Sequence, residues 1–459
     1  MKKKLLSVLL SAAMVTTLLT GCGGSDTGSA AQAPAAEETE TAEAPAQETA
    51  DPASKEIVFW NTGTEGVDKQ LIDKVVEQFN ATTQSGYTVK SVPTQNDTYK
   101  EKLVIAMSSG ECPDLYTSWS GGPMNEYIKA GFAQPIDDLI NASDLPSKLM
   151  DASLAQAKYQ DQIYGVPFLN IAVSGIYYNK DLFAQYGIEI PKTISELEAA
   201  SDIFVENGIT PFALANATKW TGSMYFMNLA ARKGGLEPFA AAVDGSGSFE
   251  DESFQYAGEK IQEWVNKGYF PEGVNSLSED DGQSKQLLYQ ESAAMICIGS
   301  WMTGTIKSDS EEFFQKIGWF PFPAVDDSSA DSSILIGTIG DNFIHFNCEG
   351  EKAAAAFEFA SLFSSDEITK FMADNGKIPP VKNAADLVTD PVTVQILEAA
   401  TNASAVQLWY DQYLPPAVAS AHLDTCQELF GLTLTPEDAN KQLQEAMKTY
   451  IEVEKEKAQ

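Results

Sequence analysis

The stretch YGVPFLNIAVSGIYYNKDLFAQYGIEIPKTISEL, residues 164–197, determines which fold the sequence predicts. The apolar run at 171–178 is typical of a buried strand, and the apolar spacing at 182–186 predicts a short helix that ends before a proline. Thr193, with Glu196 three residues later, has the spacing of a capping box and predicts the start of a longer helix. We expect the chain to cross between two lobes here.

Strand and helix patterns alternate upstream of this stretch. Apolar runs predict strands at 56–60, 87–92 and 112–116, and helical spacing predicts helices at 67–79 and 99–107. This order implies a parallel sheet with right-handed crossovers. Ligands of such sheets bind beyond the carboxyl ends of the strands, so the residues that follow the strands should lie at one edge of the first lobe. These residues are Thr62, Glu65, Ser118 and Trp119.

The downstream part predicts a second group of strands and helices. Helical spacing covers 195–207, 222–231 and 254–267, and apolar runs predict strands at 211–214 and 293–298. The segment 334–346 is predicted to rejoin the first sheet. The remainder of the chain, from 392 onward, is mainly helical in pattern.

Four short motifs resemble those of the extracellular solute-binding proteins of ABC carbohydrate importers, the maltose-binding type. They are Tyr178-Asn179-Lys180-Asp181-Leu182-Phe183, Gly299-Ser300-Trp301-Met302, Gly376-Lys377-Ile378-Pro379-Pro380 and Trp409-Tyr410. The resemblance covers roughly 56–452 and implies an α/β, two-lobed periplasmic-binding-protein type II fold with a hinge. It also implies that the tryptophan of the second motif faces a sugar.

The resemblance further implies lobes that are discontinuous in sequence. We expect lobe 1 at 55–170 and 326–376, and lobe 2 at 171–325 and 377–459. Proteins of this type capture an oligosaccharide or another sugar between the lobes and deliver it to the permease subunits of the transporter. They are not enzymes and need no cofactor.

Five of the seven tryptophans fall at the ends of predicted elements or at the starts of loops, where they can face a ligand. A sugar offers an apolar C–H face and a rim of hydroxyls, so its site needs flat aromatic surface beside carboxylates and amides. The predicted ligand-binding residues are Trp60, Thr62, Glu65, Trp119, Tyr178, Trp220, Trp301, Asp341, Asn342, Trp409 and Asp411. Trp264 and Trp319 are predicted to be packing residues, and Asp114 to serve a turn or a cap.

Other classes of function remain open at this stage. The chain has two histidines, His345 and His422, both in apolar surroundings, and no nucleophile, zinc or phosphate-loop signature. Paired carboxylates of a glycoside-active enzyme are a spatial property that a sequence does not exclude. An aromatic box with carboxylates also suits a polyamine or quaternary amine. Tyr177 with Tyr178 suggests ferric ion, although neighbouring strand residues point to opposite faces.

The first residues predict a bacterial lipoprotein signal. Lys2 to Lys4 are basic, the residues up to Leu19 are mostly apolar, and Leu19-Thr20-Gly21-Cys22 places small residues before a cysteine. We expect a signal peptide at 1–21, an acylated Cys22 that carries palmitate, and an acidic, disordered tether at 22–54. The mature protein would then be anchored to the extracytoplasmic face of the cell membrane.

The charge balance excludes one class of partner. The chain has 30 basic and 65 acidic residues, a net charge of −35, and loss of three signal-peptide lysines changes this to 27 − 65 = −38. Nucleic-acid binding needs a basic footprint, so it is excluded as a function. The expected partners are a carbohydrate, the permease and, through the anchor, the membrane, and we expect a monomer. The cysteines Cys112, Cys297, Cys348 and Cys426 lack metal-site spacing, and a disulfide among them stays open.

Overall fold

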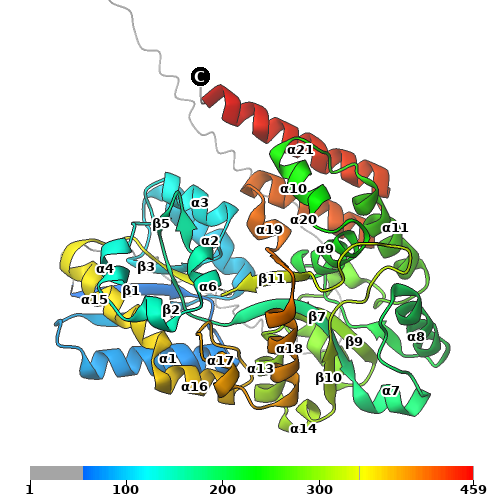
Figure 1. Ribbon diagram of the computed structural model, residues 1–459, viewed down its shortest axis with the longest axis horizontal. Coiled ribbons are helices and arrows are strands. Elements are labelled where there is room, and N and C mark those ends of the chain that lie inside the picture. Colours follow the sequence, from blue (N-terminus) through cyan, green and yellow to red (C-terminus); the bar gives the residue numbers. More distant parts are fainter. Residues whose placement is uncertain (1–54, 341, 458–459) are drawn as a thin grey trace, which may run out of the picture. The chain divides into compact units, whose positions relative to one another are not determined.

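The computed structural model describes residues 55–340 and 342–457 (Figure 1). The predicted signal peptide, the tether and Cys22 lie outside these residues. Two large β-sheets, each covered by helices, account for most of the described chain. No helix in this part of the chain has the length and apolarity needed to cross a membrane.

The first sheet has the strand order β2-β1-β3-β12-β6. Its strands are β1 (Glu56–Asn61), β2 (Thr88–Pro93), β3 (Leu115–Ser118), β6 (Val166–Pro167) and β12 (Phe343–Phe346). β1 runs parallel to β2 and β3, and β12 is antiparallel to β3 and β6. The predicted parallel order of the first three strands is therefore confirmed.

Both faces of the first sheet are buried, as the continuous apolar run of β1 predicts. The helices that flank the sheet are α1 (Gly66–Thr82), α2 (Asn96–Ser109), α3 (Gly122–Lys129), α15 (Gly350–Ser361) and α16 (Asp366–Asp374). Phe59 packs in the cluster that holds the α1 residues Leu71 and Phe79, whereas Trp60 packs with Tyr99 of α2. Alternate residues of β1 thus serve opposite faces.

The second sheet is organised around β7 (Ile171–Asn179), a strand whose nine residues are almost all buried. Its strand order is β13-β11-β7-β9-β8, and β10 also pairs with β7. The other strands are β8 (Thr210–Phe212), β9 (Ala293–Gly299), β10 (Ile317–Phe320), β11 (Leu335–Ile339) and β13 (Val406–Gln407). β7 is antiparallel to β9 along one edge and to β11 and β10 in succession along the other.

The helix starts predicted after β7 are confirmed. The side chain of Asn179 accepts hydrogen bonds from the first turn of α7 (Lys180–Tyr186), and Thr193 caps α8 (Ile194–Glu206) by accepting from the Glu196 backbone N–H. Glu196 reaches back to the Lys192 N–H at 2.7 Å. The strand and both helices therefore follow the pattern that the sequence predicts.

The remaining helices of the second group are α9 (Trp220–Gly234), α10 (Glu237–Asp244), α11 (Glu252–Asn266), α12 (Gln283–Tyr289), α13 (Met302–Asp309), α14 (Glu311–Phe314), α18 (Pro391–Asn402), α19 (Tyr410–Tyr413), α20 (Pro416–Phe430) and α21 (Pro436–Lys457). Shorter elements are α4 (Asp137–Asn141), α5 (Leu145–Lys148), α6 (Asp151–Gln156), α17 (Ala384–Leu387), the hairpin β4 (Lys158–Tyr159) with β5 (Gln162–Ile163), and the 3₁₀ turns Val274–Ser276 and Leu362–Ser364.

Three segments pass between the sheets. The chain leaves β6 for β7 at 167–171, it leaves β11 for β12 at 339–343, and a third segment at 376–380 lies beside β7, where the Ile171 N–H donates to the Ile378 carbonyl at 2.9 Å. The prediction that all of 334–346 joins the first sheet was wrong, because β11 pairs with β7 and only β12 pairs with β3. The lobe boundaries given above stay predictions.

Several residues predicted to be structural are buried in the core. Trp264 stacks on Phe212 at 5.8 Å and donates to Glu198, and Trp319 lies against β7. Asp114 accepts from the Val58 N–H at 2.9 Å and pairs with Lys352 at 3.0 Å, so it joins β1 to α15. The four cysteines of the described residues are buried free thiols.

Candidate functional site

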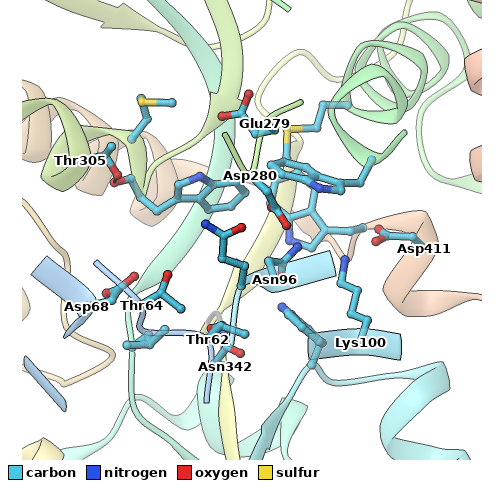
Figure 2. A pocket seen from close by; sticks show the side chains of 18 of the residues that line it. Thr62, Thr64, Asp68, Asn96, Lys100, Glu279, Asp280, Thr305, Asn342 and Asp411 are labelled. Atoms are coloured by element: carbon cyan, nitrogen blue, oxygen red, sulfur yellow. Dashed lines mark hydrogen bonds between the residues drawn. The ribbon is translucent and has the colours of Figure 1, made fainter. Parts of the chain in front are cut away.

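A cavity of about 260 Å³ lies between the two sheet groups (Figure 2). The first group lines it with Thr62, Thr64, Glu65, Asp68, Gln95, Asn96, Lys100 and Trp119, and the crossing segments with Leu169 and Asn342. The second group contributes Trp220, Met224, Met227, Glu279, Asp280, Gly282, Lys285, Trp301, Met302, Thr305, Trp409, Asp411 and Gln412. One water needs roughly 10 to 15 Å³ of such space, so the cavity has room for a ligand of many atoms.

Three tryptophans form a continuous aromatic wall on the second group's side. The ring of Trp301 meets that of Trp220 at 5.9 Å and that of Trp409 at 6.0 Å, both edge to face. Each follows or begins an element: α9 starts at Trp220, β9 ends just before Trp301, and α19 starts just after Trp409. Trp119, directly after β3, faces the cavity from the first group. Flat apolar surface is thus available on both sides.

Three buried polar atoms at the cavity have no hydrogen-bond partner within the described chain. They are Trp220 Nε1, a donor, and Asn342 Oδ1 and Gln412 Oε1, which are acceptors. Buried polar atoms are nearly always paired in folded proteins, because an unpaired one costs about 1 to 3 kcal/mol. Because each of the three atoms is itself covered, a ligand can pair with it only after a rotation of its side chain, which lines the cavity.

Most charged groups at the cavity are already engaged. Lys285 pairs with Asp309 at 2.8 Å and lies 3.7 Å from Glu65, and Lys377 pairs with Asp68 at 2.5 Å. Two further contacts involve α2, since Asp280 accepts from the Asp97 backbone N–H at 3.0 Å and Lys100 lies 3.9 Å from the Asp97 carboxylate. Asp280 has no lysine partner among the described residues, so its negative charge remains at the cavity.

The other two carboxyl groups of the cavity are held toward their neutral forms. Burial raises the pKa of Glu279 to about 7, while its hydrogen bond from Ser284 and the charge of Lys285 oppose the rise and Asp280 adds to it. Burial also raises the pKa of Asp411, against the opposing charge of Lys100. With a pKa of about 7, Glu279 is protonated in about half of the molecules at pH 7, and its protonated form can both donate and accept hydrogen bonds.

Eight of the eleven predicted ligand-binding residues line the cavity. They are Thr62, Glu65, Trp119, Trp220, Trp301, Asn342, Trp409 and Asp411. Their contact with a ligand stays a prediction. Asp341 lies outside the described residues.

The structure places two predicted ligand-binding residues, Trp60 and Tyr178, away from the cavity. Trp60 lies on the face of β1 that packs against α2, under the Lys102 side chain. Tyr178 packs against Phe183 at 4.6 Å on the far part of β7. Both corrections have the same cause: the pleat of a strand assigns alternate residues to opposite faces, and these two face a neighbouring element.

The tyrosine pair proposed for ferric ion diverges. Tyr177 is fully buried and its hydroxyl bonds to Thr303 at 2.6 Å, whereas Tyr178 is half-buried on the other face of β7. The described residues also contain no cluster of three or more His, Cys, Asp or Glu that could hold a metal ion. This arrangement gives no support to the ferric alternative.

Neither histidine reaches the cavity. His345 sits in β12 and its Nδ1 lies 2.8 Å from the Tyr164 carbonyl oxygen, and His422 lies inside α20 with its Nε2 2.7 Å from Ser223 Oγ. Burial lowers the pKa of His345 to about 4 and that of His422 to about 3, so both are neutral near pH 7. Their surroundings are those of packing residues, in agreement with the apolar sequence around each.

Sequence patterns missed part of the cavity. Met224 and Met227 follow a helical apolar pattern that also fits a core residue, and Glu279, Asp280 and Lys285 lie in or after an acidic, glycine-containing loop that resembles a solvated one. The only available signal for the loop was its density of carboxylates. Its position beside the cavity depends on the tertiary fold.

Comparisons with known proteins agree with this architecture. The profile of the bacterial extracellular solute-binding proteins matches residues 63–370. An uncharacterized ABC transporter extracellular-binding protein of Pyrococcus horikoshii is 27% identical over 96% of this chain and 94% of its own length. The multiple sugar-binding protein of Streptococcus mutans is 24% identical over 70% of this chain and 78% of its own.

Solved structures confirm the predicted two-lobed, hinged α/β fold. A structure from work on xylan utilization by the thermophilic bacterium Caldanaerobius polysaccharolyticus superposes with a TM-score of 0.78 at 29% identity, over 85% of this chain and 99% of that chain. A chitin oligosaccharide binding protein also gives a TM-score of 0.78, at 26% identity over 86% of this chain and 98% of its own.

The first prediction concerns the tryptophan at the centre of the aromatic wall. Trp301→Ala should weaken ligand binding about ten- to seventyfold, because stacking that covers about 60 to 100 Å² of apolar surface at ~25 cal/mol per Å² is worth roughly 1.5 to 2.5 kcal/mol. Trp301 is partly exposed, so the melting temperature of the unliganded protein should change by only a few degrees. Titration calorimetry and thermal unfolding measure the two effects.

Trp264→Ala is the matched control, because this tryptophan is fully buried and does not line the cavity. It should cost about 3 to 5 kcal/mol of folding free energy. An unfolded Trp301→Ala protein, or a folded one with full affinity, would contradict the assignment of Trp301 to the site.

The second prediction concerns pH. The folded state raises the pKa of Glu279 from 4.5 to about 7, so the folded protein binds more protons than the unfolded one and loses stability as the pH rises through this window. Glu279→Gln removes that loss. The variant should be close to wild type in unfolding free energy at pH 5 and more stable by up to about 3 kcal/mol at pH 8. Denaturant unfolding at both pH values checks this, and an equal difference at both would refute it.

Proposed function

Because this chain belongs to the bacterial extracellular solute-binding proteins, we propose that it captures an oligosaccharide between its two lobes and delivers it to the permease of an ABC importer. The observation that carries the proposal is the set of unpaired polar atoms beside the tryptophan wall. A sugar matches both features at once. Its C–H face stacks on an indole, while its hydroxyls both donate and accept hydrogen bonds.

The same atoms disfavour the amine alternative. Protonated polyamines donate hydrogen bonds and accept none, so they satisfy Asn342 Oδ1 and Gln412 Oε1 but leave Trp220 Nε1 unpaired. A quaternary ammonium group has neither an N–H nor a lone pair, so this group pairs with none of the three. Four of the five carboxyl groups at the cavity are offset: Glu65 and Asp68 lie near lysines, and burial raises the pKa of Glu279 and of Asp411. The fifth, Asp280, accepts from a backbone N–H. A neutral, hydroxyl-rich ligand fits this chemistry best.

Relatives support the same choice of ligand class. The names of the Streptococcus mutans relative and of the chitin oligosaccharide binding protein both refer to sugars. Those proteins and their family are binding proteins, which supports a role without catalysis for this chain. We propose that it acts as a monomer and needs no cofactor.

The third prediction tests the ligand class. The purified protein is titrated with xylotriose, maltotriose, chitotriose and spermidine, while the tryptophan fluorescence and the radius of gyration are followed. We expect one of the sugars to change both signals, because closure of the lobes around a ligand buries the tryptophans and compacts the protein. A response to spermidine alone would overturn the sugar assignment. Weakening of the response by salt would point to an ionic ligand in the same way.

We also propose that the mature protein is held at the outer face of the cell membrane by an acylated Cys22. The support is the basic, apolar and small-residue order of residues 2–22. Each methylene of a palmitate or related chain that enters a bilayer contributes roughly 0.8 kcal/mol to the free energy of membrane binding. Lipidation at this cysteine therefore anchors the protein.

The fourth prediction follows from the anchor. Cys22→Ala should move the protein from the membrane fraction to the soluble fraction with ligand affinity within about twofold of wild type, because the residues that line the cavity begin at Thr62. Fractionation and calorimetry measure the two properties. Ser25→Ala, three residues away, is the control and should stay with the membrane. Continued membrane association of Cys22→Ala would refute the anchor.

A further inference from the structure

Two adjacent glycines form an unusually close contact between α3 and α19. A Cβ atom on Gly121 would lie 2.3 Å from the carbonyl oxygen of Gln412, and one on Gly122 would lie 2.1 Å from the carbonyl oxygen of Leu414. Both obstacles are backbone atoms, so no side-chain rotation relieves the overlap. An alanine at Gly122 would force the two backbones apart by more than about 1 Å to reach an ordinary contact.

The two sides of this contact belong to different sheet groups. α3 follows β3 of the first sheet, and its Tyr127 packs edge to face on Tyr116 of β3 at 6.0 Å. α19 is fixed to the second group through Tyr410, whose ring stacks on Phe239 of α10 at 3.8 Å and whose backbone N–H points to the sulfur of Met227 at 3.0 Å. The glycine contact therefore exists only while the groups stand at this spacing.

The same contact sets the position of three cavity residues. Trp409, Asp411 and Gln412 lie in or next to α19 and line the cavity opposite Trp119 and other residues of the first group. Figure 1 shows α19 on the second group, with α3 among the helices of the first. Gly121 and Gly122 do not line the cavity themselves. A change at either glycine would thus reach the ligand only through the placement of α19.

We propose that Gly121 and Gly122 are positioning residues for ligand capture: their lack of side chains lets the lobes close far enough for α19 to complete the site. The proposal rests on the proposed capture of an oligosaccharide between the lobes. In the open state the two backbones are apart and the glycines have no role. In the closed state they determine how closely Trp409 and Gln412 approach a bound sugar, since binding groups must be held within about 0.5 Å.

Gly122 is the better of the two positions for a test. Gly121 has a φ of +86°, so any side chain there also strains the backbone. Gly122 is the first residue of α3 and is not among the positive-φ glycines, and alanine is favoured in a helix. Gly122→Ala therefore adds the steric obstacle, together with the smaller local penalty that a Cβ on a helical residue before Pro123 brings. Asn125→Ala, one turn further along α3, is the matched control because it removes atoms instead of adding a Cβ.

The fifth prediction is measured on the full mature protein in detergent, with the tightest-binding trisaccharide of the panel. Gly122→Ala should raise the dissociation rate constant about tenfold or more and change the association rate constant less than about threefold, because encounter precedes closure. The ligand-induced decrease in the radius of gyration should shrink. The melting temperature of the unliganded protein should stay within about 2 °C of wild type. Asn125→Ala should behave as wild type in both rate constants.

Each other outcome decides against the proposal. A folded Gly122→Ala protein with wild-type kinetics and compaction shows that closure does not need the glycine. A Gly122→Ala protein that fails to fold shows that the contact serves the fold itself. Failure of the proposed function is a separate result. If the fluorescence and radius of gyration of the wild-type protein change only with spermidine, sugar capture is refuted, and the glycine contact is then tested with spermidine as the probe.

Discussion

The pairing of β7 with its three neighbouring strands is the interaction on which the rest of the site depends. β7 is bonded to β9 on one edge and to β11 and β10 on the other, and Gly175 in its middle leaves room for the Trp319 ring, which a Cβ would meet at 2.3 Å. The strand also holds the turn that carries Trp301. Ser300 Oγ donates to the Ile171 carbonyl at 2.7 Å and accepts from the Val173 N–H at 3.2 Å. The central tryptophan of the cavity is thus fixed to the strand that joins both halves of the second sheet.

The chain is strongly acidic, and four of the five carboxyl groups that line its cavity are offset by lysines or by burial. The lysines at the cavity pair with carboxylates, burial raises the pKa of Glu279 and of Asp411, and Asp280 accepts from a backbone N–H. The groups left unpaired are one indole N–H and two amide oxygens. Neutral donors and acceptors select by geometry and not by long-range attraction, which suits a ligand recognised by the directions of its hydroxyls. The surplus acidity elsewhere keeps an extracytoplasmic protein soluble.

The sequence predicted the fold well because the relevant signals are local. The cap at Thr193 and the apolar run of β7 need only neighbouring residues to be recognised. The partners of a strand cannot be recognised in this way. The apolar pattern of β11 is compatible with either sheet, and only the structure shows that β11 pairs with β7. The same distinction applies to the site. A tryptophan after a Gly-Ser turn could be assigned to the cavity, whereas Trp60 faces α2 because of the pleat, and Glu279 reaches the cavity through a loop whose path no local pattern specifies.

Two contacts across the cavity affect the spacing of the lobes: the bond of Asp280 to α2 favours a close approach, and the backbone contact at Gly121 and Gly122 limits it. The start of α2 lacks a cap of its own, and Asp280 of the other group supplies one by accepting from the Asp97 N–H at 3.0 Å. Such a cap is worth about 0.5 to 2 kcal/mol, and it is available only when the groups are close. Backbone contact at Gly121 and Gly122 sets the limit of that approach. The attraction is modest, and the steric limit is rigid because it involves backbone atoms. A ligand that stacks on the tryptophans and pairs the three free polar atoms can therefore supply most of the closing free energy, while the glycines determine the width at which closing stops.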